Sequence, residues 1–213
     1  MESKLFTPVT FGPLTLRNRT IRSAAFESMC SGNAPSDMLL DYHRSVAAGG
    51  IGMTTVAYAA VTQSGLSFDR QLWMRPEIIP GLRRLTDAIH AEGAAAGIQL
   101  GHCGNMSHKS ICGCMPVGAS SGFNLYSPTF VRGLRADELP EMARAYGRSV
   151  NLAREAGFDS VEIHAGHGYL ISQFLSPSTN HRKDEFGGSL QNRMRFMDMV
   201  MEEVMKAAGS DMA

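Results

Sequence analysis

Two histidines and a tyrosine, His164, His167 and Tyr169, stand within six residues of one another. Imidazole and phenol groups can donate hydrogen bonds or protons near neutral pH when their surroundings allow it. In one interpretation, the imidazoles hold an electron-poor carbonyl oxygen while the phenol protonates a nearby carbon. In a second, His102 and Cys103 join the two histidines as nitrogen and sulfur ligands of a metal. In a third, the histidines only end a strand and cap a turn.

The segments around these residues alternate between short apolar runs and longer stretches of helical periodicity. That alternation predicts an α/β protein built on a parallel sheet. We expect strands at residues 20–25, 52–57, 95–100 and 160–164. We expect helices at about residues 36–48, 80–92, 138–156 and 190–208. Ser189 is placed to cap the N-terminus of the last helix.

Polar residues directly follow two of the expected strands, with Gln99 and His102 at one and His164 and His167 at the other. The carboxyl ends of parallel strands meet at one edge of a sheet, so these side chains should converge there. A (β/α)8 barrel places its chemistry at that edge, and a doubly wound open sheet is the alternative. Four strand–helix units use all 213 residues, whereas a closed barrel takes roughly 250 or more. We therefore expect residues 1–213 to form about the first four units of one barrel domain.

The segment 174–196 is rich in Ser, Asn, Arg, Asp and Gly, and its first half has no helical or strand periodicity. A loop of this kind is ordered only when side chains satisfy its backbone groups. We expect Asn180, Arg182, Asp184 and Arg193 to do so.

The run from His164 onward resembles the signature of the Old Yellow Enzyme family of flavin-dependent ene-reductases. The matching motifs are His164-x-x-His167-Gly-Tyr169-Leu170, Phe174-Leu-Ser-Pro, Asn180-x-Arg182-x-Asp184 and Phe186-Gly-Gly-Ser189-x-x-Asn192-Arg193-x-Arg195-Phe196. Upstream, Lys4-Leu-Phe-Thr-Pro and Gln99-Leu-x-His102-x-Gly104 resemble the family's opening and its third strand. The resemblance covers essentially all of this sequence, but only about the first half of a typical member.

The resemblance implies an enzyme with a barrel that binds FMN at the carboxyl ends of its strands. Such an enzyme takes hydride from NADH or NADPH and delivers it through the flavin to an activated alkene, such as an enone or enal. By this resemblance His164 and His167 bind the substrate's activating oxygen, and Tyr169 donates the proton. The residues implied around the flavin are Ala24, Ala25, Phe26, Tyr58, Gln99 and His164. Many members have Thr or Cys where this chain has Phe26.

The charge balance and hydropathy of the chain indicate which classes of binding partner to expect. With 20 Lys and Arg against 20 Asp and Glu, the chain has no charge excess to attract nucleic acid or an anionic membrane. No run approaches the roughly 18 apolar residues of a membrane span, and the N-terminus lacks a secretory signal. We expect a cytoplasmic protein acting on a small molecule. Because four strands leave open edges, we expect a homo-oligomer or completion by a missing C-terminal half.

Two alternatives to the flavoenzyme remain. A zinc-dependent hydrolase would use the histidine and cysteine cluster, and a noncatalytic half-barrel would serve as a folding or assembly partner. The four cysteines are too sparse for a disulfide scaffold, so we expect reduced thiols. Cys112 and Cys114 lie in a Gly-, Pro- and Ser-rich stretch, where such a pair is more often incidental than metal-binding.

Overall fold

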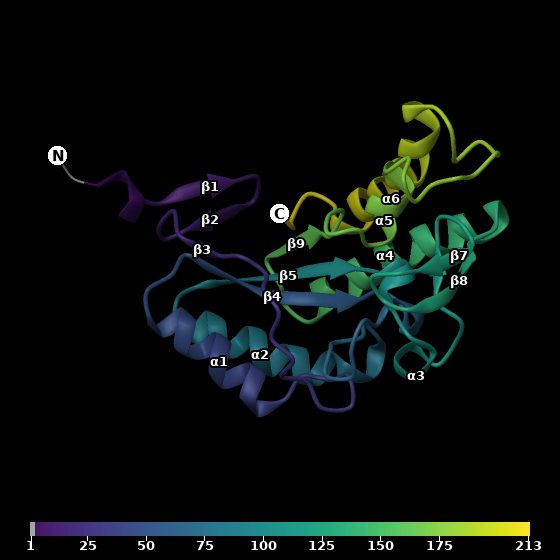
Figure 1. The fold of residues 1–213 in the computed structure, drawn as a ribbon. Helices are drawn as coiled ribbons and strands as arrows, with labels where there is room; N and C mark the ends of the chain where they lie inside the picture. The colour runs from purple at the N-terminus through teal and green to yellow at the C-terminus, as the bar shows by residue number, and fades with distance from the viewer. Residues whose placement is uncertain (1–2) are drawn as a thin grey trace.

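The computed structural model describes residues 3–213, and a four-stranded parallel sheet lies at its centre (Figure 1). Its strands are, in spatial order, β3 (Ile21–Arg22), β4 (Met53–Ala60), β5 (Ala95–Gly101) and β9 (Ser160–Ile163). Each adjacent pair is parallel, with Met53 opposite Ala95 and Gly97 opposite Ser160. The predicted α/β class with a parallel sheet is confirmed. Within residues 3–213 the sheet is open, with β3 and β9 at its two edges.

Four long helices follow the predicted pattern to within two residues. They are α1 (Asp37–Ala48), α2 (Ile79–Ala91), α4 (Leu139–Glu155) and α6 (Leu190–Ala208). Ser36 caps α1 by accepting from the backbone N–H of Leu39, and Ser189 caps α6 by accepting from that of Asn192. These bonds satisfy amide groups that have no partner within the helix, which fixes where each helix begins.

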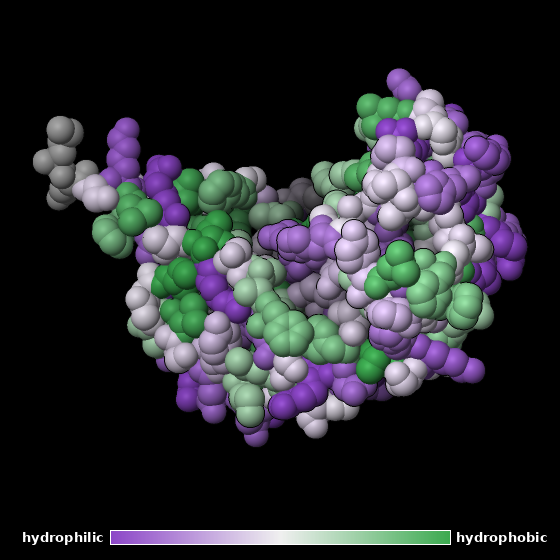
Figure 2. Space-filling view, viewed as in Figure 1, coloured by the Kyte–Doolittle hydropathy of each residue, from purple (hydrophilic) through white to green (hydrophobic). Residues whose placement is uncertain are grey.

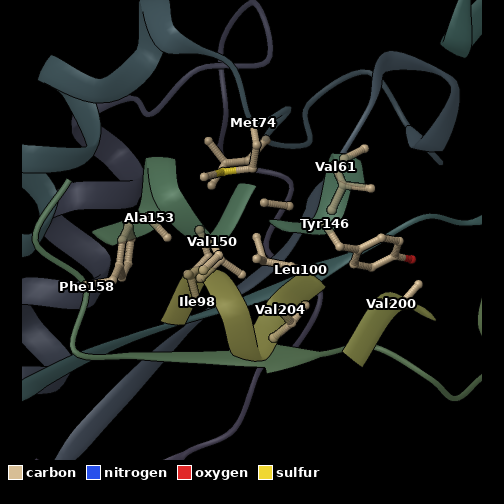
Figure 3. Close-up of a cluster of buried hydrophobic side chains, with 14 of the residues drawn as sticks. Val61, Met74, Ile98, Leu100, Tyr146, Val150, Ala153, Phe158, Val200 and Val204 are labelled. Carbon is tan, nitrogen blue, oxygen red and sulfur yellow. The ribbon is translucent and has the colours of Figure 1, made fainter. Parts of the chain in front are cut away.

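The helices cover one face of the sheet, here called the helix-covered face, to which Val56, Ile98 and Leu100 belong. These three side chains are fully buried, and they join one apolar core with residues of α2, α4 and α6. Figure 3 shows Ile98 and Leu100 beside Tyr146 and Val150 of α4. Helix α4 also packs closely on α6. Burial of this continuous apolar layer is the main driving force for the fold.

The opposite face of the sheet, here called the open face, carries small and polar residues. A Cβ atom added at Gly97 would lie 2.9 Å from Ser160 Oγ and 3.1 Å from Thr55 Oγ1, so these three residues share that face. Gln99 and Glu162 follow them toward the carboxyl end of the sheet and are opposite each other in register. Figure 2 shows the molecule hollowed between the N-terminal hairpin and the lobe that contains the segment after α5.

Several elements were not predicted from the sequence. An N-terminal hairpin pairs β1 (Val9–Phe11) with β2 (Leu14–Leu16), and a second small sheet contains β6 (Val117–Gly118), β7 (Gly122–Asn124) and β8 (Thr129–Gly133). Short helices form at α3 (Lys109–Cys112) and α5 (Leu170–Leu175), and 3-10 turns at Lys4–Phe6, Gln63–Gly65, Pro76–Ile78, Gly104–Met106 and Ala136–Glu138. None of the helices in residues 3–213 combines the length and apolar character that crossing a lipid bilayer requires.

The first expected strand is corrected in length. Residues 20–25 were expected to pair throughout, but the ladder stops after Arg22. The segment that follows leaves the sheet and runs along the rim of a cavity.

Candidate functional site

A cavity of about 240 Å³ opens where β4, β5 and β9 end. Its lining contains every residue predicted for the flavin and substrate site, together with Ala57 and Phe68, which were not predicted. The lining residues are Ala24, Ala25, Phe26, Ala57, Tyr58, Phe68, Gln99, His164, His167 and Tyr169. The cavity therefore joins side chains from five separate parts of the chain.

An irregularity in β4 brings two consecutive residues to this cavity. The register against β5 shifts between Val56 and Ala59, which is how a β-bulge redirects side chains near functional sites. Ala57 and Tyr58 consequently both line the cavity instead of pointing to opposite faces. The Tyr58 hydroxyl donates to the carbonyl of Gly65, and its burial raises the pKa of that phenol well above its usual value. Tyr58 is thus a fixed, neutral wall.

Gly101 makes room for this arrangement. A Cβ atom at this position would lie 2.8 Å from the ring of Tyr58 and 3.1 Å from the Cβ of His164. No residue with a side chain fits here without displacing one of the two. The glycine at the end of β5 is therefore a packing requirement of the site.

The two predicted histidines contact each other. Nε2 of His164 and Nδ1 of His167 are 3.3 Å apart, so one ring donates to the other. His164 is 7% exposed, and its burial, together with the neighbouring His167, lowers its pKa. The buried imidazole is therefore neutral at pH 7. A neutral imidazole still has one N–H, so the pair can donate a hydrogen bond to an oxygen.

His167 has a left-handed backbone conformation, with φ at 53° between Gly166 and Gly168. For a residue with a side chain, this conformation costs roughly 1 kcal/mol. Strain of this kind often occurs at functional sites, where the surrounding structure holds a side chain in a required direction. Here the turn brings the ring of His167 to within 5.0 Å of the ring of His164, centroid to centroid.

Tyr169 completes the cluster from the N-cap position of α5. Its ring centroid lies 4.8 Å from that of His164 and 5.3 Å from that of Tyr58. Burial raises the pKa of the Tyr169 phenol, and the Ser67 hydroxyl opposes part of that rise. The phenol therefore keeps its proton at neutral pH and is available as a donor.

Gln99 projects from β5 at the rim of the cavity. Its side-chain Nε2 donates to Oε1 of Glu162 on the neighbouring strand β9, with the two atoms 2.5 Å apart. This bond sets the direction of the amide. Glu162 was not predicted, because a lone acidic residue inside a strand gives no recognisable sequence signal.

The segment that carries Ala24, Ala25 and Phe26 is anchored by Glu27, which was also not predicted. Its carboxylate lies 2.7 Å from Arg22 Nη1 and 3.0 Å from His43 Nε2, and it accepts from the backbone N–H of Ala57 at 3.1 Å. This mostly buried carboxylate fixes the segment beside the carboxyl half of β4. Phe26 itself is 75% exposed and contacts the ring of Phe68, with centroids 4.6 Å apart.

His102 and Cys103 do not join the histidine pair. His102 is fully buried, its Nε2 lies 3.0 Å from Ser64 Oγ, and its Nδ1 accepts from the backbone N–H of Gly104. Burial lowers its pKa to about 3. The Cys103 thiol donates to the carbonyl of Leu66. Because both ring nitrogens and the thiol already have partners, and no metal-binding cluster of His, Cys, Asp or Glu occurs among residues 3–213, the geometry does not support the zinc interpretation.

The loop after α5 is held as predicted. Asn180 donates to the carbonyls of Phe174 and Phe186, at 2.7 and 2.8 Å. Arg182 pairs with Asp184 and donates to the carbonyls of Ala119 and Leu134, and Arg193 donates to that of Leu175. These polar residues therefore hold the backbone of the loop.

A model of the NADH:flavin oxidoreductase / NADH oxidase family matches residues 4–213. The chain is 42% identical over 209 residues to 4,4'-dithiodibutanoate disulfide reductase of Rhodococcus erythropolis, covering 98% of this chain and 52% of that protein. It is 37% identical over 209 residues to NADPH dehydrogenase of Bacillus subtilis strain 168, covering 96% of this chain and 60% of that protein.

Solved structures similar to this chain include related reductases. The old yellow enzyme homologue from Zymomonas mobilis superposes with a TM-score of 0.91 at 30% identity, covering 99% of this chain and 62% of that one. Morphinone reductase in complex with tetrahydroNAD superposes with a TM-score of 0.90 at 28% identity, covering 99% and 63%. The chain thus spans roughly half to three fifths of the length of these relatives. It belongs to the NADH:flavin oxidoreductase / NADH oxidase family.

Proposed function

We propose that this chain supplies the ring-binding and substrate-binding part of an FMN-dependent oxidoreductase that uses NADH or NADPH to reduce activated alkenes. It would form about the first four units of a single (β/α)8 barrel domain. The observation that carries this proposal is the convergence of His164, His167 and Tyr169 on one cavity at the carboxyl ends of the strands. Membership of the family supports the choice of cofactor and of hydride donor.

The cavity fits the flat part of a flavin. Three of its lining residues, Ala24, Ala25 and Ala57, are small, Tyr58 forms a rigid wall, and the amide of Gln99 stands at the rim, where it can hydrogen-bond a ring edge. None of the lining residues is a lysine or arginine. The ring would therefore be held here, and the phosphate would depend on groups outside this cavity. When bound, FMN supplies hydride transfer between the nicotinamide and the substrate.

The histidine pair would bind and polarise the substrate. An alkene accepts hydride only when an attached carbonyl withdraws electron density from it. Fixed N–H groups directed at the carbonyl oxygen stabilise the negative charge that develops there. The 3.3 Å contact between His164 and His167 keeps the two rings in a set orientation before the substrate arrives.

Tyr169 would donate the proton that the substrate carbon needs after hydride addition. Its raised pKa keeps the phenol protonated at neutral pH, and its ring borders the same cavity as His164. Proton donation by a positioned side chain contributes roughly 100-fold or more to a rate.

Separate measurement of the two half-reactions tests this assignment. In Tyr169→Phe with FMN bound, reduction of the flavin by NADPH or NADH should keep its rate, while reoxidation by 2-cyclohexenone should slow by about 100-fold. The matched control is Tyr126→Phe, because Tyr126 is 94% exposed and lies outside this cavity. Equal losses in both half-reactions would assign Tyr169 a structural role. A chain that binds no flavin under any condition would support the noncatalytic alternative.

A second candidate substrate is an organic disulfide, because the Rhodococcus erythropolis relative at 42% identity is described as a disulfide reductase. Supplying 4,4'-dithiodibutanoate in place of the enone and measuring released thiol distinguishes the two. Turnover that depends on both FMN and nicotinamide would favour the disulfide.

The open edge at β9 supports completion of the sheet by further strands, from a second copy of this chain or from a separate barrel half. A groove of about 620 Å³ beside that edge is lined by apolar residues, including Val161, Ile163, Met197 and Met201. Exposed strand edges tend to pair with other chains. We therefore expect the purified chain to elute from size-exclusion chromatography as an oligomer, with light scattering as the mass measurement. A monodisperse monomer of 23.1 kDa that binds FMN tightly would contradict this.

A further inference from the structure

Two cysteines outside the proposed site, Cys112 and Cys114, lie with their sulfur atoms 3.9 Å apart. Cys112 is the last residue of α3 and is buried, whereas Cys114 is exposed. A disulfide bond needs a separation of about 2.0 Å. The remaining distance is small enough for a rotation of the exposed side chain to close it.

The glycine between the cysteines produces this proximity. Gly113 follows the end of α3 with φ at 73°, a left-handed conformation that reverses the chain direction. Its N–H donates to the carbonyl of Lys109 at 2.9 Å, and the Cys112 thiol donates to the carbonyl of Cys114 at 3.2 Å. These bonds hold the turn so that both thiols face each other.

The other two cysteines are much less reactive. Cys30 and Cys103 are both buried, and burial raises the pKa of each thiol to about 12. A thiol with so high a pKa holds almost no thiolate, which is the reactive form. Partial burial and the neighbouring Cys112 raise the pKa of Cys114 as well, while the positive charge of Arg132 opposes that rise. Of the four thiols, solvent reaches that of Cys114 most readily.

We propose that Cys112 and Cys114 form a redox-active dithiol that exchanges with low-molecular-weight organic disulfides. The Cys114 thiolate attacks one sulfur of the disulfide, forming a mixed disulfide and releasing one thiolate. The Cys112 thiolate then attacks the Cys114 sulfur, which forms the Cys112–Cys114 bond and releases the second thiolate. The dithiol is oxidised by two electrons, the organic disulfide is reduced, and the two thiol protons go to the released thiolates.

The position of the pair couples it to the rest of the molecule. Ile111, next to Cys112, packs against the cluster that contains Tyr58 and Cys103, which Tyr169 also contacts. The dithiol therefore lies on a segment that supports one wall of the proposed site. The exchange itself needs neither flavin nor nicotinamide, so it is independent of the proposed function.

The test uses the full chain, reduced and then freed of reductant, without flavin. Incubation with hydroxyethyl disulfide at mildly alkaline pH is followed by alkylation in denaturant and peptide mass spectrometry. We expect the peptide with Cys112 and Cys114 to lose two hydrogen masses and to resist alkylation, while Cys30 and Cys103 become alkylated. An unchanged dithiol peptide, or a mixed disulfide on Cys114 that never resolves, would overturn the proposal.

Two variants identify the order of attack. Cys112→Ser should accumulate the mixed disulfide on Cys114, and Cys114→Ser should react at least tenfold more slowly than the native chain. Cys30→Ser serves as the matched control and should still form the Cys112–Cys114 bond. Equal rates in Cys114→Ser and the native chain would contradict the proposed role of Cys114. If a variant fails to fold by circular dichroism, the result for the native chain decides.

Discussion

The two faces of the central sheet differ in residue type and in burial. On the helix-covered face, Val56, Ile98 and Leu100 have no exposed surface. On the open face, Gly97 and Gln99 alternate with these residues along β5, and Glu162 follows on β9. Successive residues of a strand point to opposite sides, so a shift of one residue separates the apolar core from the proposed ligand-binding surface. Alternate positions of β5 therefore contribute to the apolar core and to the proposed site.

The energetic consequence differs between the faces. Each fully buried aliphatic side chain contributes roughly 1.5–3 kcal/mol through removal from water. A polar pair that water reaches, such as Gln99 and Glu162, contributes roughly 0–1 kcal/mol. The open face thus contributes little to the free energy of folding. Its residues can therefore vary with the proposed binding role without a large loss of stability.

The largest expected difference in the free energy of unfolding is between variants of two neighbouring residues on β5, Ile98 and Gln99. Ile98→Ala leaves a cavity beneath the helices and should lower the free energy of unfolding by about 2–5 kcal/mol. Gln99→Ala removes only the bond to Glu162 and should change it by less than about 1 kcal/mol. Urea denaturation of both variants measures the two values. Equal losses would show that the open face also stabilises the fold.

The helices and most of the sheet were predictable because their apolar periodicity is strong and local. The hairpins β1–β2 and β7–β8 were not, since neither has the two-residue Asn-Gly or Asp-Gly turn that marks a hairpin in a sequence. Residues 23–25 were expected in a strand because periodicity alone does not reveal where a strand leaves its ladder.

From residue types alone, the site was predictable where those residues stand close together in sequence, as in His164, His167 and Tyr169. The family resemblance added the more distant residues Ala24, Ala25, Phe26, Tyr58 and Gln99, which line the same cavity. Phe68 and Glu27 act through contacts that form when distant segments meet. Phe68 reaches Phe26 across a loop, and Glu27 reaches His43 on α1. A single sequence contains no spacing rule that reports such contacts.

The second prediction concerns His102, a polar residue at the end of β5 that is nevertheless fully buried. Its pKa is about 3 in the folded chain against an ordinary value of 6.5. Protonation therefore favours the unfolded state. Its contribution to stability is complete above pH 6.5 and is lost as the pH falls toward 3. By about pH 5 the loss should be on the order of 2 kcal/mol.

Urea denaturation at several pH values measures this loss. In His102→Asn the dependence on pH between 6.5 and about 5 should be shallower than in the native chain, even though the variant is less stable throughout. His164, whose pKa is also lowered, accounts for a dependence that remains. An identical slope in the two proteins would mean that His102 is not the titrating group.

The smallest expected effect on stability is at His167, which lines the proposed site and has a strained, left-handed backbone conformation. His167→Gly removes the strain of φ at 53° but increases the freedom of the unfolded chain, and these two effects nearly cancel. The free energy of unfolding should change by less than about 0.5 kcal/mol. His167→Ala keeps the strain but also keeps the smaller freedom of the unfolded chain, so its stability should lie within about 1 kcal/mol of that of His167→Gly. A loss above about 2 kcal/mol in His167→Gly would mean that the contact with His164 stabilises the fold, and the separation between the two faces would then fail at this residue.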